Sequence, residues 1–169
     1  MDALEAILRR RSIRKYRPDP VEPAKVTKLL AAAMAAPSAG NEQPWHFLIL
    51  TERARLDAIP EVHPYAQMLK EAPLAIVVCG DERLEKHTGY WVQDCAAAVQ
   101  NILVAATGLG LGSVWLGVHP REDRVRAVRS LLGVPAHVTP LAIVALGYGA
   151  EEKGPSERYN DERVHREKW

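Results

Sequence analysis

The chain has 169 residues, with 22 lysines and arginines against 21 aspartates and glutamates, so its formal net charge is +1. This length suits one domain with a sizeable core, and we predict a single domain over residues 1–169. The even charge balance argues against a long polyanion as partner, since nucleic-acid binders usually carry a large basic excess. The charge balance is still compatible with a local basic cluster that holds a small anion.

The cysteines and the N-terminus favour a cytoplasmic protein. Cys79 and Cys95 lie in apolar stretches without a CxxC motif, which predicts two buried thiols. In "MDALEAILRRRS" the basic residues follow the apolar ones, the reverse of a signal peptide. Residues 95–120 lack charged side chains over a length that could cross a bilayer. They also include Gln100, Asn101 and four glycines, so we expect a buried helix followed by a strand, and no membrane partner.

In the first half of the chain, the pattern predicts two helices and two strands. Apolar residues at helical spacing indicate a helix over residues 2–11. A second helix begins with a proline and covers residues 23–36, with Glu22 as its cap. Residues 46–50 read as a strand, and the continuous apolar run 74–80 is typical of a strand covered on both faces.

The second half continues with a long helix over residues 90–107, apolar nearly all round and therefore expected at the centre. A strand over 112–118, a short helix over 121–131 that ends before Gly133, and an apolar strand over 139–147 follow.

Residues 148–169 differ from the rest because they hold six acids and five bases but few apolar residues. A frayed tail is one interpretation. We favour an extended arm that packs on another surface, exchanged between the subunits of a symmetric dimer. Its expected anchors are Tyr148, Tyr159, Val164 and Trp169.

Several catalytic motifs are missing. The glycines of "GLGLGS" (108–113) close a helix and open a strand, the opposite order from a dinucleotide fingerprint. No P-loop, GxSxG motif or metal-spaced histidine pair occurs. No catalytic acid, base or nucleophile is therefore predicted, and a cofactor is expected to carry the chemistry.

Two segments stand out. In "RRSIRKY" (10–16) the arginine forks suit phosphate oxygens, and Arg10 and Arg14 would share a face if the helix persists. A solvated basic helix end is the alternative, because cations favour helix C-termini. The second segment, "AAPSAGNEQPWHF" (35–47), is a loop rich in turn-forming and hydrogen-bonding residues that leads into a strand.

Together these segments resemble the nitroreductase family of flavin mononucleotide (FMN) enzymes. The elements Arg-Arg-Ser-x-Arg-x-Tyr and Pro-Ser-x-x-Asn-x-Gln-Pro-Trp-x-Phe are followed in order by "GLGSVWLGV", "LGYGAEEKGPSERY" and "RVHREKW", so the likeness covers essentially the whole chain. It implies an α+β, three-layer fold with a mainly antiparallel central sheet flanked by helices and an extended C-terminal arm. It also implies a homodimer with FMN at the interface.

The resemblance assigns cofactor-binding roles to residues of the basic segment and the arm. Arg10 and Ser12 would hold the phosphate and the ribityl end, with Arg11 as a neighbouring candidate. Arg158 would return from the arm to the phosphate, and Arg14 would reach the ribityl chain or the pyrimidine edge.

Other roles fall near the flavin ring. Gln93 would lie close to the flavin, and Leu116 and Gly117 would pass beside the ring with backbone donors near N5. Many larger relatives carry an acid where Leu116 stands, which leaves donor and substrate use open. Four residues would reach the isoalloxazine from the other subunit: Pro37, Ser38, Ala39 and Asn41.

The function implied is an FMN-dependent oxidoreductase that passes hydride from NADH or NADPH to a nitroaromatic, quinone or enone. The alternatives are a flavin-dependent dehalogenase or flavin-turnover enzyme of the same superfamily, a non-catalytic FMN-binding module, and a small basic-patch nucleic-acid binder. Neither the nucleotide preference nor the acceptor follows from the residues. The only room for a lid over the flavin is residues 81–90.

Overall fold

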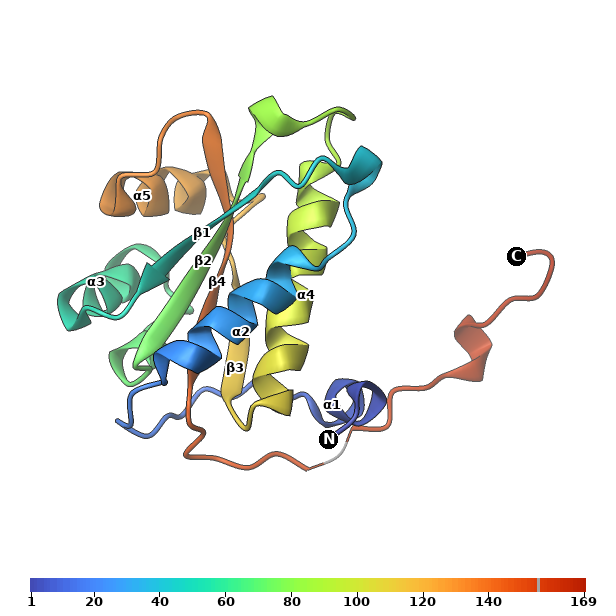
Figure 1. The fold of residues 1–169 in the computed structure, drawn as a ribbon, viewed down its shortest axis with the longest axis horizontal. Helices are drawn as coiled ribbons and strands as arrows, with labels where there is room; N and C mark the ends of the chain where they lie inside the picture. Colours follow the sequence, from blue (N-terminus) through green and yellow to red (C-terminus); the bar gives the residue numbers. More distant parts are fainter. Residues whose placement is uncertain (155) are drawn as a thin grey trace.

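The structure, a computed structural model, describes residues 1–154 and 156–169. Four strands form one sheet in the order β1-β2-β4-β3, with every neighbouring pair antiparallel. The central strands β2 and β4 lie between β1 and β3 (Figure 1). Both are buried along their whole length, as expected for continuous apolar runs. The strands are β1 (Trp45–Leu50), β2 (Leu74–Asp81), β3 (Gly112–Gly117) and β4 (Val138–Gly147).

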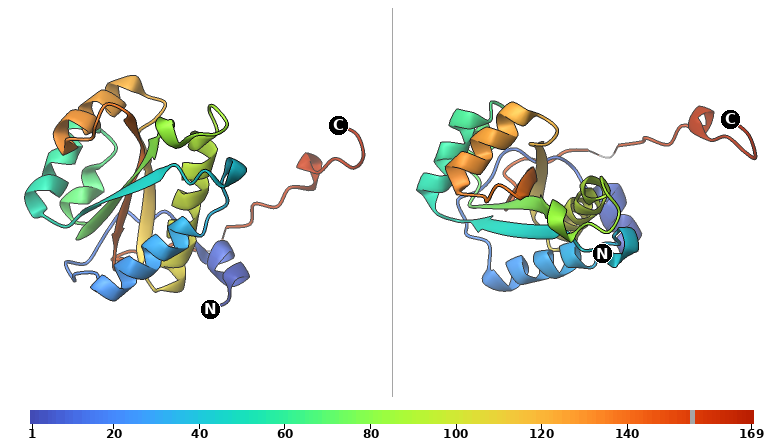
Figure 2. Two further views of the ribbon diagram at one scale, coloured as in Figure 1. Left: turned by 45° about the horizontal axis from the view of Figure 1, so that its top comes forward. Right: turned by 90° about the horizontal axis from the view of Figure 1, so that it is seen from above.

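Helices cover both faces of the sheet, which gives three layers (Figure 2). One face packs against α2 (Pro23–Met34) and α4 (Trp91–Gly108), and the other against α3 (Arg53–Val62) and α5 (Glu122–Leu132). The protein has two hydrophobic cores, one on each face of the sheet. Neighbouring side chains of β4 contribute to both cores, because successive residues of a strand point to opposite faces. The predicted α+β three-layer architecture is thereby confirmed.

Helix α4 contacts both the hydrophobic core on the α2 side of the sheet and the N-terminal helices. Its alanines allow α2 to approach closely, and the Asn101 side-chain amide donates to the Ala32 carbonyl oxygen at 2.9 Å. The short helix α1 (Ala3–Arg9) packs on α4 as well. After α4 the chain turns through Gly110, which has a φ of 74°, and enters β3. The glycines of 108–113 therefore close a helix, as predicted.

Residues 51–73, for which the sequence pattern predicts no element, form α3 and a 3-10 turn, Gln67–Lys70. The pattern misses α3 because the helix contains Pro60 and buries only a narrow face. The guanidinium of Arg53 donates to the carbonyl oxygens of Leu69 and Ala72, which stabilises the return of the chain to β2. Tertiary contacts thus compensate for the weak local signal.

The first helix is shorter than predicted. It ends at Arg9, and Arg10 has left helical geometry with a ψ of 126°. The chain then runs along the outer edge of β3, where Ser12 forms a parallel bridge with Ser113. The helix does not persist to Arg14, so the condition under which Arg10 and Arg14 would share a helical face is not met.

The C-terminal arm begins against the body and then leaves it (Figures 1 and 2). The Lys153 ammonium donates to the Ser12 carbonyl oxygen at 2.5 Å. Of the four expected anchors, Tyr148 packs within this chain and accepts a hydrogen bond from Lys25 at 2.6 Å. The side chains of Tyr159, Val164 and Trp169 are exposed.

Both cysteines are buried and unbridged, as predicted. Within residues 1–154 and 156–169, no helix combines the length and the apolar character needed to cross a membrane.

Candidate active site

A basic hollow of about 300 Å³ lies where α1, α4 and the arm meet. Burial, followed by the positive charges of Arg158 and Arg11, lowers the pKa of Arg10 below its ordinary value. Among the described residues that line the hollow none is an acid, so the gathered guanidinium groups lack an internal counter-ion. The lining residues are Ile7, Leu8, Arg10, Arg11, Gln100, Ser156, Arg158 and Tyr159.

Arg11 holds this arrangement together. Its guanidinium donates to the carbonyl oxygen of Gly154 at 2.8 Å and to that of Leu8 at 2.8 Å. A third bond reaches the carbonyl oxygen of Arg10 at 2.7 Å. These bonds fasten the start of the arm to the end of α1, which brings Arg158 to Arg10.

A second hollow, of about 420 Å³, lies further along the basic segment and brings together three predicted residues: Arg14, Leu116 and Gly117. The backbone amide of Arg14 donates to Glu151 Oε1 at 2.6 Å, so the arm also fixes this part of the segment. Four residues of extended chain span at most about 14 Å. One elongated ligand with an anionic group at one end could therefore reach both hollows.

The edge of β3 forms one wall of the second hollow. The amide of Ile13 donates to the Ser113 carbonyl oxygen at this edge, at 3.0 Å. Since backbone groups alternate in direction along a strand, Trp115 and Gly117 turn their amides to the same edge. A Cβ atom added to Gly117 would meet no described atom within 4 Å, so a flat ring could approach this backbone closely.

The carbonyl oxygen of Gly117 is held at the same edge by two side chains. It accepts a hydrogen bond from His63 Nε2 at 2.9 Å and one from the Arg124 guanidinium at 3.2 Å. His63 is 1% exposed, so its ring acts as a fixed support for the end of β3. Leu116 is buried in the core between the sheet and α3 and α5. An acid at position 116 would thus be placed in an apolar core.

Five residues of the second hollow carry no signal in the sequence: His63, Tyr65, Gln67, Met68 and Arg124. Four of them belong to the segment without a predicted element. The Arg124 guanidinium lies over the Tyr65 ring, 5.2 Å from its centroid, a contact between α5 and the α3 connection. Only the tertiary fold brings these residues to the edge of β3.

Ser12 lines neither hollow and lies between them along the chain, and the other predicted residues lie in a third place. Neither hollow is lined by Gln93 or by the loop that holds Pro37, Ser38, Ala39 and Asn41. Figure 1 places this loop near the start of α4 and α1 near its other end. The loop forms a 3-10 turn, with φ of 54° at both Gly40 and Asn41. Within one chain, the predicted residues thus fall into three groups.

The nitroreductase family model matches residues 7–64 and 56–148. This match covers well over half of the chain, and the chain belongs to the nitroreductase family, whose members include named oxidoreductases. The family membership expected from the sequence motifs is thereby confirmed.

The chain is 54% identical over 169 residues to a Methanothermobacter thermautotrophicus protein provisionally named NADH dehydrogenase/NAD(P)H nitroreductase, covering 100% of this chain and 88% of that protein. A solved structure from Parabacteroides distasonis with the same provisional name matches with a TM-score of 0.95 and 46% identity, over 99% of this chain and 98% of that one. A Desulfovibrio desulfuricans structure, provisionally described as a nitroreductase in complex with FMN, matches with a TM-score of 0.86 and 32% identity, over 100% and 98%.

Proposed function

We propose that the chain is an FMN-dependent oxidoreductase that uses NADH or NADPH to reduce an electron-poor small molecule such as a nitroaromatic, quinone or enone. The observation that carries this proposal is the basic hollow, where Arg10 and Arg158 converge and no described lining residue is an acid. FMN ends in a phosphate, and guanidinium groups pair well with phosphate oxygens. The FMN-bound relative at 32% identity supports the same cofactor.

The residues present fit FMN in both hollows. Arg10 and Arg158 would hold the phosphate, and Ser12 lies between the hollows along the chain. Arg14 would reach the ribityl chain or the pyrimidine edge, where its positive charge stabilises the negative charge that reduction brings. The amide of Gly117 would donate to the ring from the edge of β3.

When bound, FMN supplies hydride transfer at N5, between the nicotinamide donor and the acceptor. No side chain of this protein is assigned as a catalytic acid or base. The chain contributes binding, orientation and electrostatics.

We further propose a homodimer in which the whole chain, residues 1–169, forms one flavin-binding domain per subunit. Pro37, Ser38, Ala39 and Asn41 would reach the partner's flavin, since in their own chain they border neither hollow. Gln93, at the same end of α4, would lie near that flavin.

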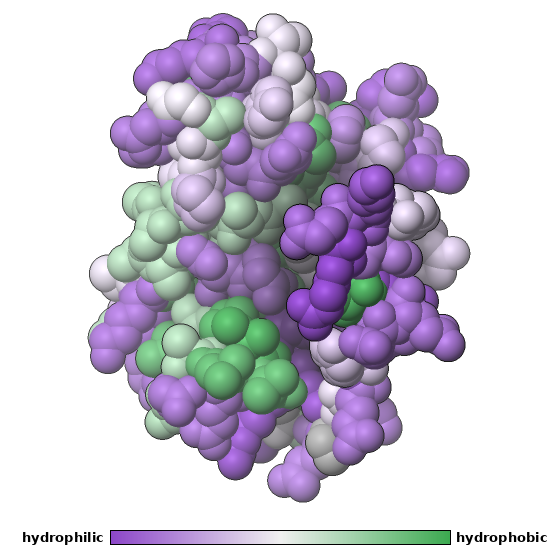
Figure 3. All heavy atoms as spheres, turned by 90° about the vertical axis from the view of Figure 1, so that its right-hand side faces the viewer, coloured by the Kyte–Doolittle hydropathy of each residue, from purple (hydrophilic) through white to green (hydrophobic). Residues whose placement is uncertain are grey.

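Exposed apolar surface supports the dimer. Helix α1 exposes Leu4, Ile7 and Leu8, and Figure 3 shows an apolar patch on the face where α1 and the arm lie. Trp169 at the end of the arm is exposed as well. Contiguous exposed apolar patches are typical of interaction sites.

The test is to purify the protein without added flavin, record its visible spectrum, and add NADH or NADPH without oxygen. Flavin bands that bleach support the proposal and rank the two donors. Flavin that stays oxidised with both donors indicates a binding module, and flavin that is itself consumed indicates a flavin-turnover enzyme. A colourless protein that cannot take up FMN overturns the proposal.

A further inference from the structure

Two buried carboxyl groups lie beneath the loop that holds four residues of the predicted site: Pro37, Ser38, Ala39 and Asn41. Glu42, at the end of the 3-10 turn, is 7% exposed, and Asp94, in the first turn of α4, is 5% exposed. Asp94 Oδ1 accepts a hydrogen bond from the Ala39 amide at 3.0 Å. Glu42 Oε2 accepts bonds from the amides of Lys86 at 2.7 Å and His87 at 3.1 Å. The two carboxyl groups thus join three segments: the loop, the 85–90 connection and α4.

Within the described part of the chain, the other oxygen of each carboxyl group has no donor. Glu42 Oε1 and Asp94 Oδ2 are buried, and among the described residues no further group donates to them. Each carboxyl group also shifts the pKa of the other: Glu42 raises that of Asp94, and Asp94 lowers that of Glu42. Ionised carboxylates only accept hydrogen bonds, so a proton on one of the two groups would let it donate to an unpartnered oxygen of the other.

The surrounding charges do not replace that proton. Glu85 adds negative charge near Asp94, and the Cys95 thiol next to it has its pKa raised to about 12, chiefly by burial. The Lys86 ammonium donates to the Gly40 carbonyl oxygen at 3.0 Å. His87 is the neighbouring group whose positive charge, when protonated, favours an ionised Glu42.

The position of the proton follows from these contacts. Burial raises the pKa of Asp94; the Ala39 amide opposes this effect, and Glu42 and Glu85 add to it. Burial acts in the same direction on Glu42, but the hydrogen bonds from the Lys86 and His87 amides and the neighbouring Asp94 carboxyl lower its pKa below the ordinary value. A proton on the pair is therefore held more tightly by Asp94, and Glu42 is the group that ionises more readily.

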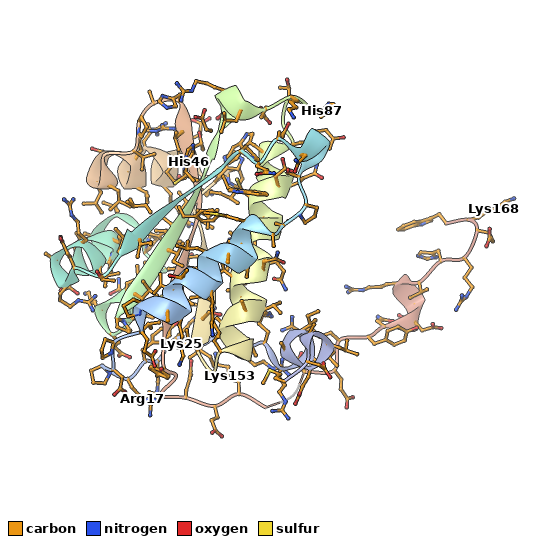
Figure 4. All side chains as sticks on the ribbon, in the orientation of Figure 1. Arg17, Lys25, His46, His87, Lys153 and Lys168 are labelled. Carbon is orange, nitrogen blue, oxygen red and sulfur yellow. The ribbon has the colours of Figure 1, made fainter. Side chains whose placement is uncertain are left out.

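We propose that Glu42 and Asp94 share one proton and act as positioning residues that fasten the loop 37–41 for contact with the partner's flavin. Figure 4 shows His87 beside this loop, and a Cβ atom on Gly40 would lie 2.9 Å from His87 Nε2. The turn is therefore packed tightly against the segment that Glu42 holds. Loss of the proton leaves two like charges in contact and releases the loop. The flavin part of this inference rests on the proposed function.

The first test compares FMN affinity from mildly acidic to mildly alkaline pH. Glu42→Gln and Asp94→Asn replace the shared proton by an amide donor, so their FMN affinity should vary less with pH than that of the wild type. Glu42→Ala and Asp94→Ala leave a buried polar group unpartnered and should weaken FMN binding about tenfold. Glu122→Gln is the control, since Glu122 is exposed and pairs with Arg126 at the surface. Alanine variants that bind FMN like the control would overturn the positioning role.

The second test needs no flavin. Infrared difference spectra of the apoprotein, recorded in a pH series that starts above the ordinary pKa of aspartate, should show a protonated carboxyl band in the wild type and in Glu122→Gln. The band should be missing in Asp94→Asn and Glu42→Gln. A wild type without the band overturns the shared proton.

Hydrogen exchange of the Ala39 amide separates this inference from the proposed function. Exchange should be faster in Asp94→Ala than in Asp94→Asn, because only the asparagine keeps an acceptor for that amide. Equal exchange in both variants overturns the positioning role. If the wild type does not bind FMN at all, the proposed function fails, and the infrared band and Ala39 exchange still decide whether the pair fastens the loop.

Discussion

Groups of like charge gather near both ends of α4, basic groups at one end and carboxyl groups at the other. Near its C-terminal half, Arg10 and Arg158 gather positive charge and no described residue lining the hollow is an acid. At its N-terminus, Glu42 and Asp94 bring two carboxyl groups together. Arginine stays charged in proteins, so the basic end requires an anion from solution. A carboxyl group is neutralised by one proton. The basic end therefore has the character of a ligand site, and the acidic end that of a structural clasp.

Removing the distal part of the arm is expected to have the largest effect on the sites near both ends of α4. Deleting residues 160–169 keeps Arg158 but removes exposed Val164 and Trp169, which we expect to lie on the partner. The prediction is a monomer that retains almost no FMN, because the partner's loop is then absent. Light scattering and the flavin-to-protein ratio measure this, with circular dichroism to check folding. A truncated protein that stays dimeric and yellow would contradict the exchanged-arm interpretation.

The basic end is tested next by Arg10→Ala. A hydrogen bond to a charged group contributes about 1.5–3 kcal/mol, so the Kd for FMN should rise about 10- to 150-fold. Riboflavin, which lacks the phosphate, should bind wild type and variant equally. The control is Arg9→Ala, since Arg9 pairs with Glu5 at 2.9 Å on the surface of α1. Equal losses for FMN and riboflavin would show that Arg10 does not read the phosphate.

Gly117→Ala tests the β3 edge that connects the basic hollow to the ring site. The added methyl group meets no described atom within 4 Å, so the melting temperature should barely change. FMN affinity should fall about tenfold, because the methyl would occupy the space of a ring against the backbone. The matched control is Gly108→Ala at the end of α4, where a Cβ also meets open space. Unchanged FMN affinity in Gly117→Ala would show that the flavin ring does not lie against this edge of β3.

The smallest effect concerns stability at the acidic end. Because burial raises the pKa of Asp94 in the folded state, the native protein holds a proton that the unfolded chain has lost above the ordinary pKa of aspartate. The part of the unfolding free energy that Asp94 contributes should therefore be complete below the ordinary pKa of aspartate and be lost as the pH rises through its raised pKa in the fold. The slope should be shallower in Asp94→Asn, as urea denaturation at several pH values would measure. Identical slopes would mean that Asp94 is ionised in the fold.

Much of the architecture could be predicted because its signals are local. The apolar runs of β2 and β4 and the alanine-rich α4 announce elements buried on both faces, and left-handed Gly133 ends α5 as expected. Glu22 occupies the cap position of α2 but its carboxylate accepts a hydrogen bond from Tyr148 instead of capping the helix. Helix α3 was beyond prediction, because Pro60 and its narrow buried face depend on contacts from distant segments.

By itself, the sequence determined the family, the order of elements and the list of arginines, because motifs and hydrophobic periodicity are carried by neighbouring residues. Only the tertiary structure decided which of those residues meet. It separates Arg10 from Arg14, adds His63 and Tyr65 to the edge of β3, and brings Glu42 to Asp94. The physical reason is that these residues lie far apart in the sequence and come together only when the layers of the fold pack. Their charges interact strongly only once burial has removed water from around them.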